Sequence, residues 1–360
     1  MPTIAVLTSG GDAPGMNAAI QAVVKVAASR GWEVLGIERG FTGLLNGVAR
    51  PLTRNADGAP YPVPEIDDIG ALGGTVLGSS REPRFVDPVE RQKAAAFLDE
   101  RGVEGLVVIG GNGSMAGAHA LSGEVDLPVV GIPASIDNDI GLTREALGVD
   151  TALNTIVEAC DRISDTARSH RRAFVVEVMG RSSGYLAMAA AVATAADAVL
   201  LPEQGRGFDE ILDSLTACIR HAFSPRRGKR RVLVIKAEGV QFPTHLLVDE
   251  LRAELSDMED VDIRGTVLGH LVRGGNSSFR DRMLGGRFGL VAVEAVLEGK
   301  TDVMVGWNLV DMGEPTSDNF IRLFSLPEVL TETEALLDGS SPVTQDRVRR
   351  MEAIHGVLSL

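Results

Sequence analysis

The chain has 360 residues, of which 44% are hydrophobic and 4% aromatic, and its formal net charge is −14. This length suits two domains, and the negative charge argues against general affinity for nucleic acid or anionic membranes. Cys160 and Cys218 lack metal-ligand spacing and are expected to be reduced, buried thiols. No apolar run reaches membrane-spanning length and no signal segment is recognisable, so we expect a cytoplasmic protein without membrane association.

The first 140 residues alternate expected strands and helices. Short apolar runs predict strands at 4–7, 33–37, 105–109 and 127–132. Apolar residues at helical spacing predict helices at about 16–30 and 87–101, and another helix after residue 114. Residues 50–66 contain four prolines and are expected to form a surface loop. This alternation predicts an α/β fold with a parallel, doubly wound sheet.

Two glycine turns follow strands in this first half, Gly10-Gly11 and Gly110–Ser114. A strand, a glycine turn and a helix in succession bring free backbone N–H groups to a phosphate. The first turn is not a Walker loop, since no Gly-Lys-Ser/Thr follows it, and no Gly-x-Gly-x-x-Gly of a dinucleotide-binding fold opens the first helix. Close packing of the backbone is the alternative interpretation of each turn.

The acidic turn Pro133–Asp139 follows the expected strand at 127–132. Pro133 cannot extend the strand ladder, so the following side chains are presented at the carboxyl end of the strand. Ligands of open α/β sheets bind at that edge. Asp137 and Asp139, with the hydroxyl of Ser135, suit a site where one carboxylate accepts a proton and the other holds a metal. The alternative is an Asx-rich turn without chemistry.

A second series of expected strands and helices follows residue 141. Strands are predicted at 173–178, 198–201, 232–235 and 303–306, and helices at 149–167 and 281–297. The basic cluster Arg168–Arg172 ends the first of these helices, where cations usually complement the helix dipole in solvent. A glycine-rich basic stretch, Ile263–Gly275, precedes the last helix. Because this series has its own apolar core, we place the domain break near residue 141.

The inventory of glycine turns, paired carboxylates and arginines suits phosphoryl transfer, which needs positioning and charge neutralisation more than covalent help from the protein. Nucleophilic serine or cysteine chemistry is poorly supported, because no Gly-x-Ser-x-Gly elbow and no Cys/His pairing occur. Five motifs go further and resemble the bacterial 6-phosphofructokinases: Leu7–Ala19, Pro133–Asp139, Val178–Arg181, Val267–His270 and Arg273–Gly275. The resemblance covers residues 1 to about 305 in unbroken order.

The resemblance implies transfer of the γ-phosphoryl group of MgATP to the 1-hydroxyl of fructose 6-phosphate, giving fructose 1,6-bisphosphate and ADP in glycolysis. It implies two doubly wound, mostly parallel sheet domains. Residues 1–140 plus about 270–306 would bind nucleotide and Mg²⁺, and residues 141–269 plus about 307–360 would bind the sugar phosphate. It also implies a homotetramer, because Arg172 and Arg264 would reach into the site of a neighbouring subunit.

Individual roles follow from the same resemblance. The catalytic residues would be Asp137 as the base, Arg181 as a transition-state cation and Ser135 at the transferring phosphate. The nucleotide would contact Gly11, Arg81, Gly111, Asn112, Gly113 and Ser114. The sugar phosphate would contact Ser135, Asp137, Arg172, Met179, Gly180, Arg181, Glu238, Arg264, His270 and Arg273. Mg²⁺ would bind at Asp139 and Asn112.

Two departures from the family pattern stand out. Asn112 occupies the place of an aspartate that helps hold Mg²⁺ in the family. Gln21, Lys25 and Ser164 stand where arginines of the family's effector pocket are expected, although Arg227, Lys229 and Arg231 keep a basic cluster that suits an anionic effector.

Three other functions stay open at this stage. A pyrophosphate-dependent phosphofructokinase would carry an aspartate and a lysine at the places of Gly113 and Ala134, so these two residues favour ATP. A catalytically weakened, sugar-phosphate-binding regulatory subunit is supported by Asn112 and opposed by the intact Asp137 and Asp139. An NAD-kinase or lipid-kinase relative would share the glycine turn but lack the acidic turn and the stretch His270–Gly275.

Overall fold

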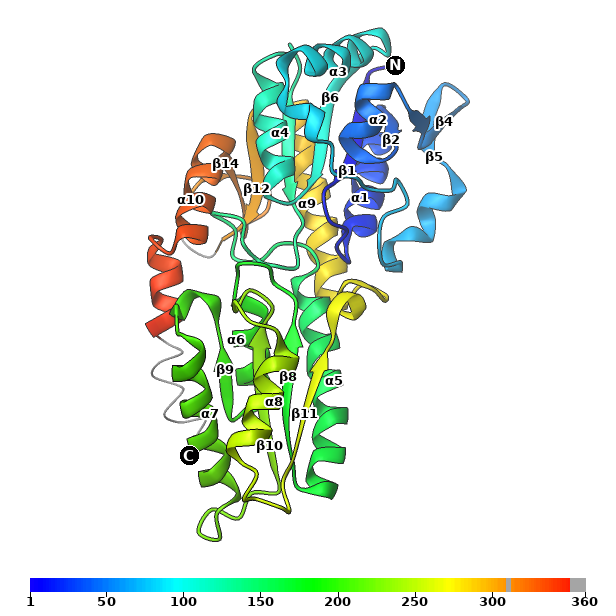
Figure 1. Ribbon diagram of the computed structural model, residues 1–360. Coiled ribbons are helices and arrows are strands. Elements are labelled where there is room, and N and C mark those ends of the chain that lie inside the picture. The colour runs from blue at the N-terminus through cyan, green and yellow to red at the C-terminus, as the bar shows by residue number, and fades with distance from the viewer. Residues whose placement is uncertain (309–311, 350–360) are drawn as a thin grey trace. The chain divides into compact units, whose positions relative to one another are not determined.

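The computed structural model describes residues 1–308 and 312–349. The chain divides into two compact units, shown in Figure 1. Unit 1 comprises Met1–Thr151 and Arg273–Glu334, and unit 2 comprises Ala152–Val272 and the segment that begins at Ala335. Both tryptophans, Trp32 and Trp307, therefore lie in unit 1.

These boundaries differ from the predicted ones in two places. The chain was expected to leave the first domain near residue 141 and again near 307, but residues 141–151 and 307–334 belong to unit 1. The physical reason is hydrogen bonding. Strand β14 (Ile321–Ser325) pairs antiparallel with β12 (Val303–Trp307), and the Gly141 N–H donates to Thr333 Oγ1 at 2.8 Å.

Within its described residues, unit 1 is built on an eight-stranded sheet. The strand order is β13 (Glu314–Pro315), β14, β12, β7 (Val129–Pro133), β6 (Val103–Gly110), β1 (Thr3–Ser9), β2 (Glu33–Ile37) and β3 (Ala49–Pro51). The five strands from β12 to β2 run parallel, and the strands outside them pair antiparallel. The carboxyl ends of β1, β6 and β7 consequently meet at one edge of the sheet.

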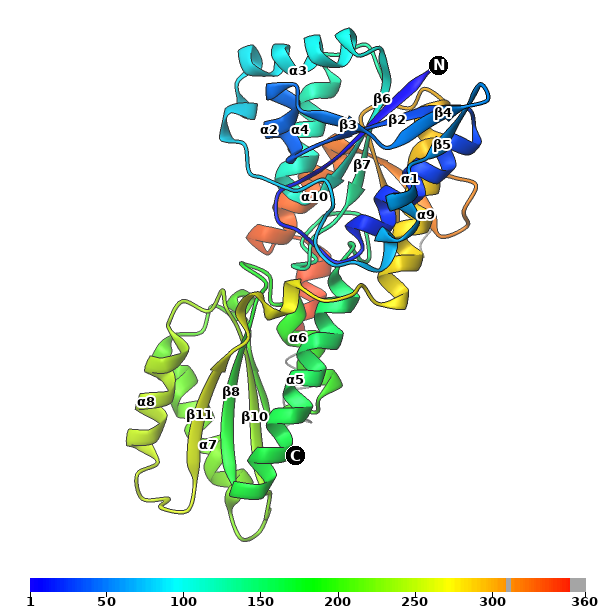
Figure 2. The same cartoon turned by 90° about the vertical axis from the view of Figure 1, so that its right-hand side faces the viewer.

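Helices cover both faces of this sheet (Figure 2). On one face α1 (Met16–Ser29) packs against α9 (Phe279–Leu297), and on the other lie α2 (Gly40–Asn46), α3 (Pro88–Glu100) and α4 (Asn112–Ser122). The α1–α9 contact is very close, since a Cβ atom at Gly289 would lie 2.5 Å from the Cβ of Ala22. The proline-rich stretch expected as a loop contains the hairpin of β4 (Thr53–Ala56) and β5 (Ala59–Pro62).

The described part of unit 2 contains a four-stranded parallel sheet in the order β11 (Asp262–Val267), β8 (Arg172–Val178), β10 (Arg231–Ala237) and β9 (Ala198–Leu200). Helices α5 (Val149–His170) and α6 (Tyr185–Ala193) lie on one face, and α7 (Phe208–Phe223) and α8 (Thr244–Glu254) lie on the other (Figure 2). Helix α10 (Leu326–Asp338) begins in unit 1 and ends in unit 2. None of the helices in the described residues has the length and apolar character needed to cross a bilayer.

An ion pair between a buried carboxylate and an exposed guanidinium joins the segment after the acidic turn to helix α9 in unit 1. Glu145 is 7% exposed, and its Oε2 lies 2.8 Å from Nη2 of Arg280. The guanidinium of Arg280 also lies 4.7 Å from the ring centroid of Trp307. Burial raises the pKa of Glu145 from 4.5 to about 7, although the charge of Arg280 opposes this shift.

We expect Glu145 to make the stability of unit 1 depend on pH. Because its folded pKa is raised, the folded state holds a proton that the unfolded state releases between pH 4.5 and about 7. The stabilising contribution is complete below that window and is lost as pH rises through it, by up to about 3 kcal/mol. Glu145→Gln should remove this pH dependence. Urea unfolding followed by tryptophan fluorescence reports on unit 1, and an equal pH dependence in both proteins would contradict the assignment.

Candidate active site

The first glycine turn lies between β1 and α1 and is held by the loop that precedes Arg81. Gly10 has a φ of +86°, its N–H donates to Ser80 O at 3.2 Å, and its carbonyl accepts from Ser79 Oγ at 2.7 Å. Arg81 is exposed and directly follows these two serines. The predicted nucleotide contacts Gly11 and Arg81 are therefore neighbours in the structure.

Arg273 lies over the first glycine turn. A Cβ atom at Gly11 would lie 3.1 Å from Nη1 of Arg273, so a side chain there would displace the guanidinium. Nη1 donates to Asp12 O at 3.0 Å, and Nη2 lies 4.0 Å from Oδ1 of Asp137. The family resemblance implies sugar-phosphate binding by Arg273, and the structure places the Arg273 guanidinium beside Asp137, the expected catalytic base.

The acidic turn is stabilised by its own side chains. Asn138 adopts a φ of +49°, donates from Nδ2 to Arg144 O at 3.2 Å and accepts the Ala146 N–H at 3.1 Å. The Asp137 N–H donates to Ser135 Oγ at 3.3 Å. Asp137 is 3% exposed and Asp139 is 8% exposed. Asn138 is thus a structural residue of the turn, whose role the sequence analysis did not assign.

The second glycine turn begins helix α4. Gly111 is the N-cap and offers no side chain to the first N–H groups, which at a helix N-terminus form a site suited to anions. A Cβ atom at Gly110 would lie 2.5 Å from Ser9 O, so close packing explains that glycine. Gly113 differs, because it is exposed and a Cβ there would meet nothing within 4 Å. Ser114 is 2% exposed.

Asn112, Ser135 and Asp139 form one hydrogen-bonded group. Asn112 Nδ2 donates to Asp139 Oδ2 at 2.8 Å, and Ser135 Oγ donates to Asp139 Oδ1 at 3.0 Å. Asn112 Oδ1 is buried and has no hydrogen-bond partner within the described residues. A carboxylate and an amide oxygen are hard donors that fit Mg²⁺. No cluster of three or more His, Cys, Asp or Glu side chains suited to a metal occurs in the described residues.

In unit 2, the loop after β8 carries three of the predicted sugar-phosphate contacts. Glu238 Oε1 accepts the N–H groups of Gly180 at 3.1 Å and of Arg181 at 2.6 Å. Gly180 has a φ of +148°, and a Cβ there would lie 2.4 Å from Ser183 O. Arg181 is exposed with a φ of +48°, and Met179 is half-buried. The structure thus brings Met179, Gly180, Arg181 and Glu238 together.

The remaining predicted contacts of unit 2 lie at the start of β8, on the edge strand β11 and in the turn after β11. Arg172 Nε and Arg264 Nε both donate to Asp262 Oδ2 at 2.9 Å. Partial burial acts to raise the pKa of Asp262, but the hydrogen bonds from Arg264 and Arg172 outweigh it and lower the pKa. His270 is exposed in the short 3-10 turn Gly269–Arg273.

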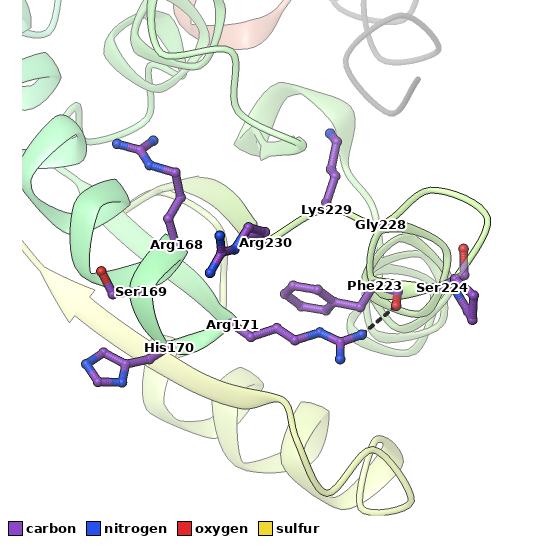
Figure 3. A pocket seen from close by; sticks show the side chains of 10 residues that line it. Arg168, Ser169, His170, Arg171, Phe223, Ser224, Gly228, Lys229 and Arg230 are labelled. Carbon is purple, nitrogen blue, oxygen red and sulfur yellow. Dashed lines mark hydrogen bonds between the residues drawn. The ribbon is translucent and has the colours of Figure 1, made fainter.

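Unit 2 also contains a basic pocket of about 540 Å³ at the end of α5 (Figure 3). Arg171 has a φ of +53°, donates to Phe223 O at 2.7 Å and pairs with Asp260. Arg168 pairs with Asp165, and Lys229 pairs with Asp197. The basic cluster at the end of α5 was predicted to be a solvated helix terminus. Its concentration of positive charge was the only sequence signal for a pocket there. The lining is Arg168, Ser169, His170, Arg171, Phe223, Ser224, Pro225, Gly228, Lys229 and Arg230.

The glycine turns, the acidic turn and the doubly wound sheets are typical of enzymes that transfer phosphoryl groups. Residues 3–296 match the phosphofructokinase family, so the chain belongs to that family. It is 44% identical over 305 residues to an ATP-dependent 6-phosphofructokinase of Thermotoga neapolitana, covering 85% of this chain and 89% of the relative. The chain is therefore a phosphotransferase.

Solved structures agree with this assignment. The Saccharomyces cerevisiae phosphofructokinase structure has a TM-score of 0.78 and 32% identity, over 96% of this chain and 47% of the yeast chain. This chain thus spans about half the length of the yeast chain. A pyrophosphate-dependent phosphofructokinase of Marinobacter aquaeolei has a TM-score of 0.74 at 22% identity, over 91% of this chain and 84% of that chain, which shows a shared fold.

Proposed function

We propose that this protein transfers the γ-phosphoryl group of MgATP to the 1-hydroxyl of fructose 6-phosphate, as a cytoplasmic enzyme of glycolysis. One structural observation supports the proposal above all. The parallel neighbours β1, β6 and β7 end at one edge of the sheet, so the two glycine turns and the acidic turn are side by side. The ATP-dependent name of the relative from Thermotoga neapolitana supports the donor.

The residues of unit 1 would bind the nucleotide and accept the proton. The N–H groups at the start of α4, together with Gly11, Arg81, Gly113 and Ser114, would contact the phosphates and nucleoside. Asp137 would accept the proton of the sugar hydroxyl, with the Arg273 guanidinium 4.0 Å from its carboxylate. Asp139 and Asn112 would hold Mg²⁺, which when bound neutralises charge on the phosphates.

The residues of unit 2 would bind the sugar phosphate. Glu238 holds the backbone of Gly180 and Arg181 by two hydrogen bonds, which supports a preformed loop for an anionic ligand. Met179 and His270 would complete the sugar contacts. Arg172 and Arg264 share Asp262 at an edge strand, which supports their proposed role toward a neighbouring subunit in a homotetramer.

A coupled assay of the purified full chain tests the proposed reaction directly. With fructose 6-phosphate as acceptor, MgATP should support turnover and pyrophosphate should not. Turnover with pyrophosphate alone would replace the donor, and binding of fructose 6-phosphate without turnover by either donor would favour the regulatory-subunit alternative.

Donor choice should depend on Gly113. Because a Cβ there meets open space, Gly113→Asp should fold normally while placing a carboxylate where the ATP α-phosphate is expected. Repulsion between these like charges should raise the KM for ATP by about tenfold or more. Steady-state kinetics at saturating fructose 6-phosphate measures this KM.

Ala116→Asp is the matched control for this prediction. It adds the same charge to an exposed position one turn further along α4, away from the helix N-terminus. The KM for ATP should then stay within about twofold of that of the wild type. An unchanged KM in Gly113→Asp would show that the nucleotide does not lie over this turn.

A further inference from the structure

The orientation of the Asn112 amide is fixed by its partners. Two atoms face the amide nitrogen, Asp139 Oδ2 at 2.8 Å and the backbone oxygen of Asp139 at 3.4 Å. The backbone oxygen can only accept a hydrogen bond, and Oδ2 can only accept one when the carboxylate is ionised. The nitrogen must therefore face Asp139, and the amide oxygen points elsewhere. That oxygen is buried and lacks a partner within the described residues.

Asp139 is consequently bound by two neutral donors on its two oxygens. Ser135 Oγ occupies Oδ1 at 3.0 Å, and Asn112 Nδ2 occupies Oδ2. Each carboxylate oxygen keeps a further lone pair for a metal. Asp139 and Asn112 together supply one negative charge and one neutral oxygen. Mg²⁺ gives up its hydration water reluctantly, so these two ligands alone should bind it weakly.

We propose that Asn112 is a positioning residue for Asp139, and that the divalent cation reaches this site with the nucleotide phosphates and does not bind the free protein. The inference rests on the proposed function, because the phosphates must supply the missing anionic oxygens. Mg²⁺ sites of this kind commonly combine one or two carboxylates with substrate phosphates. An amide at residue 112 orients the carboxylate without adding the second charge that would capture a cation in advance.

Direct metal binding tests the order of assembly. Mn²⁺, which electron paramagnetic resonance detects, is titrated into the nucleotide-free full chain, with and without a non-hydrolysable ATP analogue. The wild-type protein should bind Mn²⁺ at least about tenfold more tightly when the analogue is present. Asn112→Asp should bind Mn²⁺ without the analogue at least about tenfold more tightly than the wild type, because two adjacent carboxylates repel until a cation lies between them.

Asn112→Ala separates positioning from charge. It removes the hydrogen bond to Asp139 without adding a carboxylate, so it should bind Mn²⁺ alone no better than the wild type. Its kcat should fall by about tenfold or more, as expected for loss of a group that orients a metal ligand. A merely structural role would lower the melting temperature and leave kcat unchanged.

Each result has a defined meaning. Wild-type protein that binds Mn²⁺ equally with and without the analogue, or Asn112→Asp that gains no affinity, overturns the order of assembly. Unchanged kcat in Asn112→Ala overturns the positioning role. If the wild type has no phosphofructokinase activity, the proposed function fails instead, and that result is independent of the metal titrations.

Discussion

Replacing Asp137 by asparagine is expected to lower kcat by about 10²–10⁴, the usual loss when a general base is removed. Asparagine has nearly the same shape, so the hydrogen bond from the residue 137 N–H to Ser135 Oγ and the buried position should persist. The amide of asparagine cannot accept the proton of the sugar hydroxyl, which the carboxylate of Asp137 can accept. That carboxylate lies 4.0 Å from the Arg273 guanidinium, and Asp137 is 3% exposed. Binding of fructose 6-phosphate should change little.

Steady-state kinetics and fructose 6-phosphate titration of the variant measure these two effects separately. Asp139→Asn is the matched control, since it makes the same chemical change two residues away on the same turn. Raising the Mg²⁺ concentration should partly restore the turnover of Asp139→Asn. It should not restore the turnover of Asp137→Asn. Turnover like that of the wild type in Asp137→Asn would assign the base to another residue.

The strand ends that carry the candidate site could be predicted from the sequence. Buried parallel strands read as short apolar runs, and a glycine turn or a proline marks where each one stops. The predicted strand at 105–109 is β6 (Val103–Gly110), and the one at 127–132 is β7 (Val129–Pro133). The glycine turns and the acidic turn were therefore expected at one edge of a parallel sheet, where the structure has them.

Contacts between distant parts of the chain could not be predicted in this way. Local periodicity carries no information on the bond from Asn112 to Asp139, on the placement of Arg273 over Gly11, or on the pairing of β14 with β12. These depend on which elements pack together after the chain has folded. The hairpin within residues 53–62 was missed because prolines at edge strands give the same signal as prolines in loops.

Removing the carboxyl of Asp281 is expected to destabilise unit 1 more than removing any surface charge. Asp281 is 0% exposed, and burial raises its pKa. Its Oδ1 accepts the Gly148 N–H at 2.8 Å, and its Oδ2 accepts the N–H of Thr151 at 2.8 Å and the hydroxyl of Thr151 at 2.5 Å. Asp281→Ala would remove the acceptor of these three buried donors, at about 1–3 kcal/mol for each donor.

Urea unfolding followed by the fluorescence of Trp32 and Trp307 measures this effect, because both reporters lie in unit 1. The free energy of unfolding should fall by about 3–9 kcal/mol in Asp281→Ala. It should fall by roughly half as much in Asp281→Asn, which keeps one acceptor oxygen. Asp99→Ala, at an exposed position of α3 in the same unit, should change it by less than about 0.5 kcal/mol. If Asp281→Ala were no less stable than Asp99→Ala, these hydrogen bonds would not hold the starts of α5 and α9 together.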